Sequence, residues 1–371
     1  MKRNVFSIFA IVLTIFIVLM LTSCLAEEPD SKGLEYRVNS DEKTCTITGL
    51  GEYLEPEVII PEKIGKYTVT TIADSAFIGA QFTKVHLPDT IISIGREAFY
   101  MCELLVDINL PSSLKQIGKS AFQYCSSLES IKIPKLINIL PENVFYGCGS
   151  LKKVEFSEGL ITIGKTAFCQ CESLEQIVFP SSLQVIKEGA FMWCKQLTEV
   201  ELPKRILVLE YYIFSFCENL TDIHIPTSVA SVSVSIAIGC PKLNSITVDD
   251  SNPYFMSLDG VLYNKEVSYL LAYPSGKKDS TFIIPDTVTG IFHSSFSTNP
   301  YIEVINIPRT LNRLEGAVFS WCDNLKVVNY EGTIEEWEYI VKASDWDADS
   351  SNFIIYCTDG QITKDGAVTY K

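Results

Sequence analysis

A cysteine recurs every 23 residues along much of this chain, and this spacing constrains the fold more than any other feature. The cysteines of this series are Cys102, Cys125, Cys148, Cys171, Cys194, Cys217 and Cys240, and Cys322 resumes the pattern after an interruption. A leucine follows each cysteine by three residues, and a phenylalanine precedes most of them by three. A fixed period of this length predicts a stacked solenoid. Because a solenoid presents an extended surface, recognition is a better first expectation than catalysis.

Each repeat has the pattern of one short strand followed by two turns. Apolar residues alternate at Leu128, Ile131 and Ile133, which is typical of a strand with one buried face. Pro134 follows at once and ends the strand, because proline has no donor for a sheet. The segment from Ala121 to Cys125 is too short for much helix, so we expect a single helical turn.

The repeat pattern Leu-x-x-Ile-x-Leu-Pro-x-x-Leu-x-x-Ile-Gly-x-x-Ala-Phe-x-x-Cys resembles the BspA-like class of leucine-rich repeat over roughly residues 72–330. Three departures occur: Ser157 replaces the proline, Leu140-Pro141 replaces Ile-Gly, and the unit around residues 236–239 lacks the phenylalanine. The resemblance implies an α+β repeat solenoid of the right-handed leucine-rich-repeat type. Short parallel strands, single helical turns and a cap at each end are the expected parts.

The same resemblance, with the turn signals and composition, divides the chain into seven expected segments. They are a lipoprotein signal peptide (1–23), an acidic polar tether (24–33), an N-terminal capping hairpin region (34–71), leucine-rich repeats (72–248), a hairpin insertion (249–285), further repeats (286–330) and an acidic C-terminal cap (331–371). Asp259-Gly260 and Ser275-Gly276 are turn signals on either side of the hairpin expected in the insertion. Caps are needed because an uncovered last repeat would expose core and an open strand edge.

The first residues indicate export. Lys2 and Arg3 precede an apolar run from Val5 to Leu21, as in a signal peptide. The run is also nearly long enough to span a bilayer as an uncleaved helix. The residues Leu21-Thr22-Ser23-Cys24 resemble the lipobox of bacterial lipoproteins, which implies cleavage before Cys24 and lipid on its thiol. More than one acyl chain gives stable anchoring.

The charge balance excludes one class of partner. The chain carries 45 acidic and 30 basic residues, for a formal charge of −15. Nucleic acid binding requires lysines and arginines that neutralise phosphates, so we expect no nucleic acid partner. The same excess of acids disfavours contact between the protein body and an anionic membrane, which leaves the N-terminal lipid as the expected membrane contact.

The cysteine column permits two interpretations. Neighbouring repeats lie about 4.8 Å apart, which is within the range that a disulfide tolerates, and export would allow oxidation. Parallel inward thiols also pack well as small, weakly polar core groups, and pairing them would pull the repeats together. We therefore expect free buried thiols. Cys169-Gln170-Cys171 is not expected to bind metal, because Cys171 belongs to the column and Cys169 faces elsewhere.

No catalytic constellation is apparent in the sequence. Two of the three histidines, His86 and His224, occupy the same strand position six repeats apart, about 29 Å from each other. The chain has no nucleophile elbow, zinc-protease helix or phosphate-binding glycine loop. We expect no enzymatic activity and no cofactor.

One acidic segment begins like a calcium loop. It runs from Asp345 to Ser350, but Ser350 stands where the loop needs glycine and Tyr356 where it needs a bidentate glutamate. A polar loop of the cap is the preferred interpretation, with weak calcium binding as the alternative. We expect no metal site.

The candidate binding site is a surface formed by the outward residues of the strands. They form two columns of mixed charge: Lys84, His86, Asp107, Asn109, Lys132, Lys153, Glu155, Gln176, Glu199, Glu201, Asp222 and His224. Any one of them can equally be a solvated strand residue. For the surface as a whole we favour binding, because solenoids commonly recognise partners on such sheets.

The family resemblance further implies a cell-surface or secreted protein associated with adhesion. The leading hypothesis is a monomeric, non-catalytic lipoprotein of the cell envelope that is exposed on the surface and binds host or bacterial surface proteins. A structural envelope spacer and a glycan-capture accessory protein are the alternatives. Tyr263, Tyr269 and Tyr273 of the insertion would supply the aromatic residues that sugar binding requires.

Overall fold

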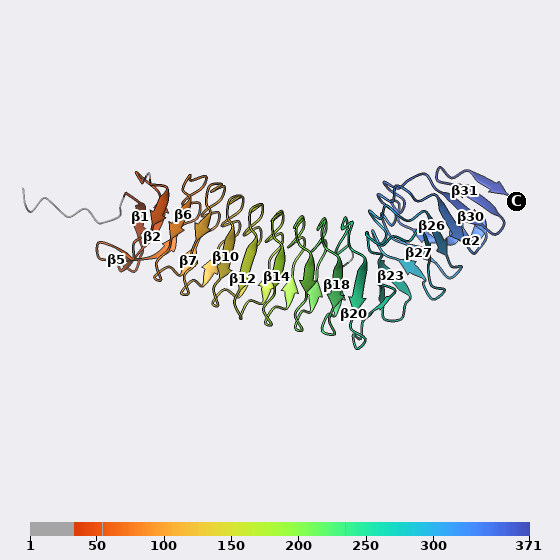
Figure 1. Cartoon of the computed structure of the whole chain (residues 1–371), viewed down its shortest axis with the longest axis horizontal. Coiled ribbons are helices and arrows are strands. Elements are labelled where there is room, and N and C mark those ends of the chain that lie inside the picture. The colour runs from red at the N-terminus through yellow and green to blue at the C-terminus, as the bar shows by residue number, and fades with distance from the viewer. Residues whose placement is uncertain (1–32, 54, 234) are drawn as a thin grey trace, which may run out of the picture.

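A computed structural model describes residues 33–53, 55–233 and 235–371. Its chain winds into an elongated stack of turns, each 23 residues long in the regular part (Figure 1). The predicted signal peptide, Cys24 and nearly all of the predicted tether lie outside the described residues.

Two columns of parallel strands run along the stack. We call the first the front sheet, because it carries the outward residues considered above. Its strands are β3 (Glu57–Ile59), β6 (Lys84–His86), β8 (Asp107–Ile108), β10 (Ser130–Ile133), β12 (Lys153–Phe156), β14 (Gln176–Val178), β16 (Glu199–Glu201), β18 (Asp222–Ile225), β20 (Ser245–Val248), β24 (Thr281–Ile283), β26 (Val304–Ile307), β28 (Val327–Tyr330) and β30 (Ile354–Cys357).

The second column, the back sheet, lies after the first turn of each repeat. Its strands are β5 (Tyr67–Ile72), β7 (Ser93–Ile94), β9 (Gln116–Ile117), β11 (Ile139–Leu140), β13 (Thr162–Ile163), β15 (Val185–Ile186), β17 (Val208–Leu209), β19 (Ser231–Val232), β23 (Tyr269–Ala272), β25 (Gly290–Ile291), β27 (Arg313–Leu314) and β29 (Val341–Lys342). Most of these strands are two residues long, so each contributes little sheet on its own and depends on its neighbours.

Each turn of the solenoid has a third side, which we call the turn side. The sequence predicts a helical turn there, but the chain adopts another conformation. Phe122 N donates to Val144 O of the next turn at 2.9 Å, and Tyr124 N donates to Tyr146 O at 2.7 Å. Ser120 and Tyr124 have φ values of 57° and 61°, outside the helical region. Every second backbone N–H group of the turn side therefore donates to a carbonyl of the next turn of the solenoid and not to one in its own turn. The prediction of an α+β fold with single helical turns is wrong, and the solenoid is built of strands and turns.

A continuous column of phenylalanines and cysteines fills the interior. The rings of Phe122 and Phe145 stack with centroids 5.4 Å apart, and those of Phe145 and Phe168 with centroids 5.3 Å apart. The Cys148 thiol donates to the carbonyl of Phe122 at 3.2 Å, and every other cysteine of the period repeats this bond to the phenylalanine 26 residues earlier, or 25 for Cys102. The cysteines of the described residues are all free and buried.

The core is divided where the period is interrupted. One cluster of buried residues extends from Leu34 to Ile246, with three further members up to Leu271, and a second extends from Val261 to Ile362. Between them, β21 (Phe255–Leu258) and β22 (Val261–Asn264) form an antiparallel hairpin through Asp259-Gly260, which have φ values of 50° and 76°. Such a pair is typical of a tight hairpin turn. Strand β22 then pairs with β23, which starts the second part of the back sheet.

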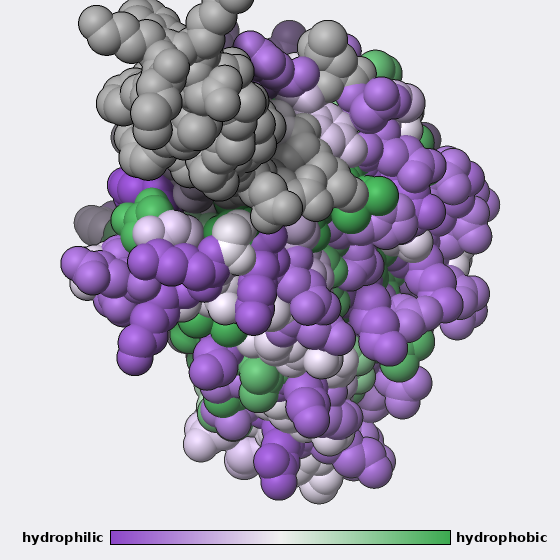
Figure 2. Space-filling model, turned by 90° about the vertical axis from the view of Figure 1, so that its left-hand side faces the viewer, coloured by the Kyte–Doolittle hydropathy of each residue, from purple (hydrophilic) through white to green (hydrophobic). Residues whose placement is uncertain are grey.

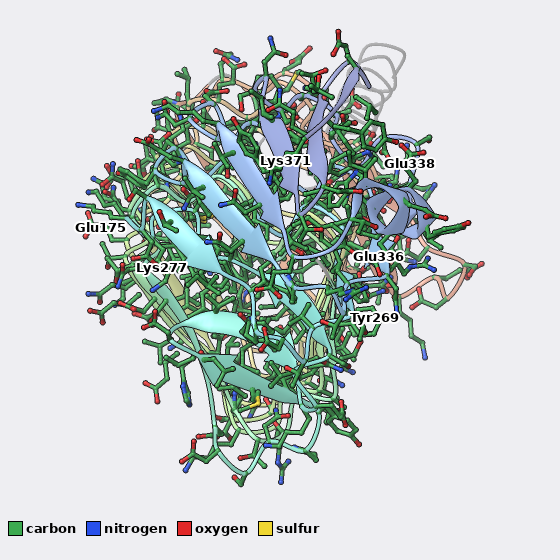
Figure 3. All side chains as sticks on the ribbon, turned by 90° about the vertical axis from the view of Figure 1, so that its right-hand side faces the viewer. Glu175, Tyr269, Lys277, Glu336, Glu338 and Lys371 are labelled. Carbon is green, nitrogen blue, oxygen red and sulfur yellow. The ribbon has the colours of Figure 1, made fainter. Side chains whose placement is uncertain are left out.

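A buried lysine fixes the hairpin to the second part of the stack. Lys277 Nζ lies 2.8 Å from an oxygen of Asp259 at the hairpin tip and 3.3 Å from an oxygen of Asp279. Burial alone would lower the pKa of Lys277, but its hydrogen bonds to the two aspartates raise it overall. In the view along the stack from the C-terminal end, Lys277 lies on the flank opposite Glu336 and Glu338 (Figure 3).

Both ends of the stack are closed by antiparallel strands. At the N-terminal end, β1 (Glu35–Val38) pairs with β2 (Thr44–Gly49), and β4 (Lys63–Ile64) pairs with β5. At the C-terminal end, β31 (Gly360–Thr363) and β32 (Val368–Tyr370) continue from β30. The one helix of the described residues, α2 (Ile334–Tyr339), begins with a capping box between Thr333 and Glu336. Viewed from the N-terminal end, hydrophilic residues cover most of the visible surface (Figure 2).

The stacked phenylalanines should carry much of the stability. We expect Phe168→Ala to lower the free energy of unfolding by about 3–5 kcal/mol, because it leaves a cavity in a fully buried column. Urea denaturation followed by circular dichroism would measure the loss. Tyr339→Ala, at a side chain that is 77% exposed, should change the free energy by less than about 0.5 kcal/mol. Equal effects of the two substitutions would contradict the packing described here.

The thiols of the column should be unreactive in the native protein. Burial raises the pKa of Cys102 to about 12, so only about 10⁻⁴ of that thiol is ionised at pH 8. We expect the eleven cysteines of the described residues to react with Ellman's reagent only after unfolding in guanidinium. Rapid reaction of several thiols in the folded chain would show that the column is open to solvent.

Candidate functional site

The front sheet places the predicted surface residues in two straight columns. Lys153 lies beside Ser130 and Glu199 beside Gln176 in the first column, while Glu155 lies beside Lys132 and Glu201 beside Val178 in the second. The columns arise because successive strands pair in parallel with a constant shift of 23 residues. The twelve predicted residues are thus brought onto one face, and all except the half-buried Lys84 and His86 are exposed.

At both ends of this face the polar groups are engaged with one another. Lys84 Nζ lies 3.3 Å from a carboxylate oxygen of Asp107. His224 lies 3.3 Å from Asp249, and its Nδ1 is 2.9 Å from the hydroxyl of Thr247. One pair lies nearer the middle of the face, where Lys153 donates a hydrogen bond to Glu155 and so lowers the pKa of that carboxyl. Pairs as exposed as these contribute little to stability, but they reduce the charge that is free to meet a partner.

Asn109 has a structural role. Its amide nitrogen donates to the carbonyl of Leu87 at 2.9 Å, and its amide oxygen accepts from the N–H of Leu87 at 3.0 Å. The strand β8 ends one residue earlier, at Ile108, so the side chain continues the hydrogen bonding that the backbone stops making. Asn109 is therefore less available for binding than its position in the sequence indicates.

The middle of the face differs from its ends. Among the described residues, Lys132, Gln176, Glu199 and Glu201 make no side-chain hydrogen bond or ion pair. In the second column Val178 lies between Glu155 and Glu201, and it is 79% exposed. A cleft of about 400 Å³ adjoins Val178 and is lined by Phe179, Glu201, Leu202, Lys204 and Arg205 as well. A signal for this feature is present in the sequence, because Val178 is an apolar residue at an outward strand position.

The tyrosines of the insertion are not a sugar-binding surface. Tyr263 is 1% exposed and Tyr273 is 3% exposed, and both belong to the second core cluster. Burial raises the pKa of both phenols. Tyr269 packs edge-on against Phe292 with ring centroids 5.5 Å apart. Tyr263 and Tyr273 therefore offer no stacking face to a sugar, because they are folded into the core, whereas Tyr269 is half-buried.

The segment that begins like a calcium loop forms the turn side of the last turn. Ala317 N donates to Asp345 O at 2.8 Å, and Trp321 N donates to Asp349 O at 2.9 Å. The intervening Trp346 packs against Phe319, with centroids 6.1 Å apart, and so extends the ring column. In the part of the chain that the structure describes, no three His, Cys, Asp or Glu side chains are grouped to hold a metal ion. Nor does this part contain a helix long and apolar enough to cross a membrane.

The family model described as BspA type leucine rich repeat region matches residues 62–156, 138–257 and 275–341, with six copies. The chain belongs to this family. The matched residues include most turns of both parts of the solenoid, whereas the hairpin turn of the insertion and the end of the C-terminal cap lie outside them. The model describes a repeat and not a catalytic domain.

Solved structures share the fold of this BspA-type protein. A leucine rich cell surface protein from Faecalibacterium prausnitzii is 23% identical with a TM-score of 0.56, and the alignment covers 84% of this chain and 97% of that one. A leucine-rich repeat protein from Bacteroides ovatus is 22% identical with a TM-score of 0.56, and the alignment covers 87% of this chain and 98% of that one. At these identities the likeness establishes the fold alone. No curated protein matches the sequence.

Proposed function

We propose that this protein is a non-catalytic, lipid-anchored surface protein that binds a protein partner through the front sheet. The lipobox-like sequence that ends at Cys24 supports the anchor. One structural relative is described as a cell surface protein, which supports the location. The observation that carries the binding role is the middle of the front sheet, where the exposed Val178 adjoins a cleft and lies beside Glu201, whose side chain is unpaired among the described residues.

The chemistry of this area suits a protein partner. Energetically important contacts cluster near the centre of an interface, around an apolar or aromatic anchor ringed by polar groups. Val178 and the adjoining cleft can receive such an anchor, while Glu201, Lys204 and Arg205 at the cleft offer both signs of charge around it. Electrostatic complementarity of this kind selects the partner more than it increases the affinity.

Charge reversal on the face tests the proposal. The variant carries Lys132→Glu, Glu155→Lys, Glu201→Lys and His224→Asp, and it is compared with the unaltered chain in capture from host matrix proteins and bacterial surface extracts. We expect a partner that the unaltered chain retains to be lost, because like charges then meet across the interface. Mass spectrometry of the eluted proteins, followed by measurement of Kd for the purified partner, gives the readout.

A matched control variant exchanges charged residues outside the front sheet and leaves the net charge unchanged. Exchanging Lys119 with Glu142 and Lys165 with Glu188 preserves two ion pairs away from the front sheet, at 2.9 Å and 2.8 Å in the unaltered protein. This control should bind normally. Equal binding by the front-sheet variant would place the site elsewhere, and capture of no partner by any form would favour the envelope spacer.

Lipid anchoring has a separate test. We expect Cys24→Ser to abolish incorporation of an alkyne-labelled fatty acid and to release the protein from the membrane fraction of the producing bacterium, because the acylated thiol is removed. In-gel fluorescence after coupling of the alkyne measures the lipid. Unchanged labelling of the variant would contradict an anchor at this residue.

A further inference from the structure

On the turn side, the junction of the two core clusters forms a second candidate site. The residue before each cysteine position lies on this side, and in order these residues include Trp193, Phe216, Gly239, Thr298 and Trp321. Gly239 N donates to the hydroxyl of Thr298 at 2.8 Å, although 59 residues separate them. The insertion thus brings small residues to the junction and leaves an aromatic residue on either side of them.

Two of these aromatic residues, Phe216 and Trp321, line a cleft. Trp193 and Phe216 stack in parallel, with centroids 4.3 Å apart and an interplanar angle of 9°. A Cβ added to Gly239 would lie 2.5 Å from the Phe216 ring, so the ring lies directly over this glycine. Trp321 is 61% exposed. Phe216 and Trp321 both line a cleft of about 470 Å³, a size within the range of small-ligand sites.

Oxygen atoms form the polar part of the cleft. Ser294 is only 9% exposed, and its hydroxyl makes no hydrogen bond with another described residue. Ser297 and Ser320 donate to the carbonyls of Ala317 and Ala348, and each hydroxyl keeps lone pairs that can accept. Asp349 adds an exposed carboxylate. None of the described residues lining the cleft is basic.

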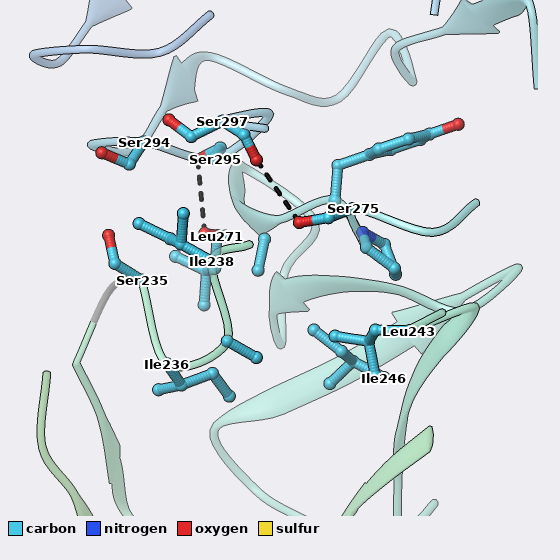
Figure 4. Close-up of a pocket in the computed structure, with 14 residues that line it drawn as sticks. Ser235, Ile236, Ile238, Leu243, Ile246, Leu271, Ser275, Ser294, Ser295 and Ser297 are labelled. Atoms are coloured by element: carbon cyan, nitrogen blue, oxygen red, sulfur yellow. Dashed lines mark hydrogen bonds between the residues drawn. The ribbon is translucent and has the colours of Figure 1, made fainter. Parts of the chain in front are cut away.

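A smaller cavity continues inward from the cleft. It shares Ile238, Ser294 and Ser297 with the cleft and is also lined by Ser235, Ser275 and Ser295 (Figure 4). The buried hydroxyl of Ser235 has no hydrogen-bond partner among the described residues. This inner cavity has a volume of about 20 Å³, which suits one water molecule as the partner of Ser235, so a larger ligand is confined to the cleft.

These features point to one ligand chemistry, and we propose that the turn-side cleft binds a neutral oligosaccharide. The C–H face of a sugar ring packs on an aromatic plane such as that of the exposed Trp321, and its hydroxyls donate to serine and carboxylate oxygens. An anionic ligand would meet Asp349 without a compensating base. A purely apolar ligand would leave Ser294 unpaired. The site is independent of the front sheet, so this proposal does not rest on the function proposed above.

Direct binding of cello-, malto-, manno- and chitotetraose to the whole mature chain tests the proposal, by saturation-transfer NMR and isothermal titration calorimetry. We expect at least one to bind at millimolar concentration. Trp321→Asn should weaken that binding by about tenfold, because it removes a stacking face. Asparagine tolerates the left-handed backbone that Trp321 adopts, with φ of 58°. Ser294→Gly should weaken binding by about fivefold for the lost hydroxyl.

Two control variants substitute residues that have nearly the same positive φ as Trp321 and Ser294 but lie outside the cleft. Met101→Asn changes the equivalent position before Cys102, where φ is also 58°, and Ser120→Gly changes a buried serine with φ of 57°. Both should bind the sugar normally, as should the front-sheet charge-reversal variant. Binding of none of the four sugars would overturn the proposal. The proposal would also be overturned if Trp321→Asn and Ser294→Gly left sugar binding unchanged while both variants showed native thermal unfolding. Tighter binding of the anionic tetragalacturonate than of every neutral probe would overturn it as well.

Discussion

The structure depends on the contact between one turn and the next, because no single turn can bury its own apolar side. Hydrogen bonds between neighbouring turns form on all three sides: in the front sheet, in the back sheet and between the segments of the turn side. Inside them, the thiol of each cysteine of the 23-residue period bonds to a phenylalanine carbonyl of the previous turn. A thiol is small enough to pack in a buried column and still donates one hydrogen bond, which explains why cysteine suits this position.

The columns of the core could be predicted from the sequence, whereas the local conformation of the turn side could not. Phe122, Cys125 and Leu128 repeat with a strict period, and their burial follows from that period alone. Ser120 and Tyr124 adopt positive φ without being glycine, so nothing in their residue types distinguishes this conformation from a helical turn. The strain is offset by hydrogen bonds to the next turn, which become visible only when the turns are stacked.

Only some of the surface residues could be placed from the sequence, because only strictly periodic positions reveal which way a side chain faces. Outward positions such as Lys132 and Glu155 follow from strand alternation, so the front sheet could be assembled from the sequence. Tyr263 and Tyr273 could not be assigned to the core, because the insertion does not follow the period. The turn-side cleft joins Phe216 and Trp321 from different parts of the solenoid, and their proximity depends on how the insertion folds. Their shared place before a cysteine position was nevertheless present in the sequence.

The one-dimensional order of the turns also determines how the protein would transmit a mechanical load. If the chain is held at its N-terminus and a partner pulls on β14 and β16, tension passes only through the turns that precede those strands. The strands cross the long axis of the stack (Figure 1), so such tension pulls neighbouring turns apart, and every interface between the held end and the partner bears the same force. The turns beyond the partner, including the insertion and the turn-side cleft, carry no load. A sugar bound there would stay attached while the other end of the molecule is being stretched.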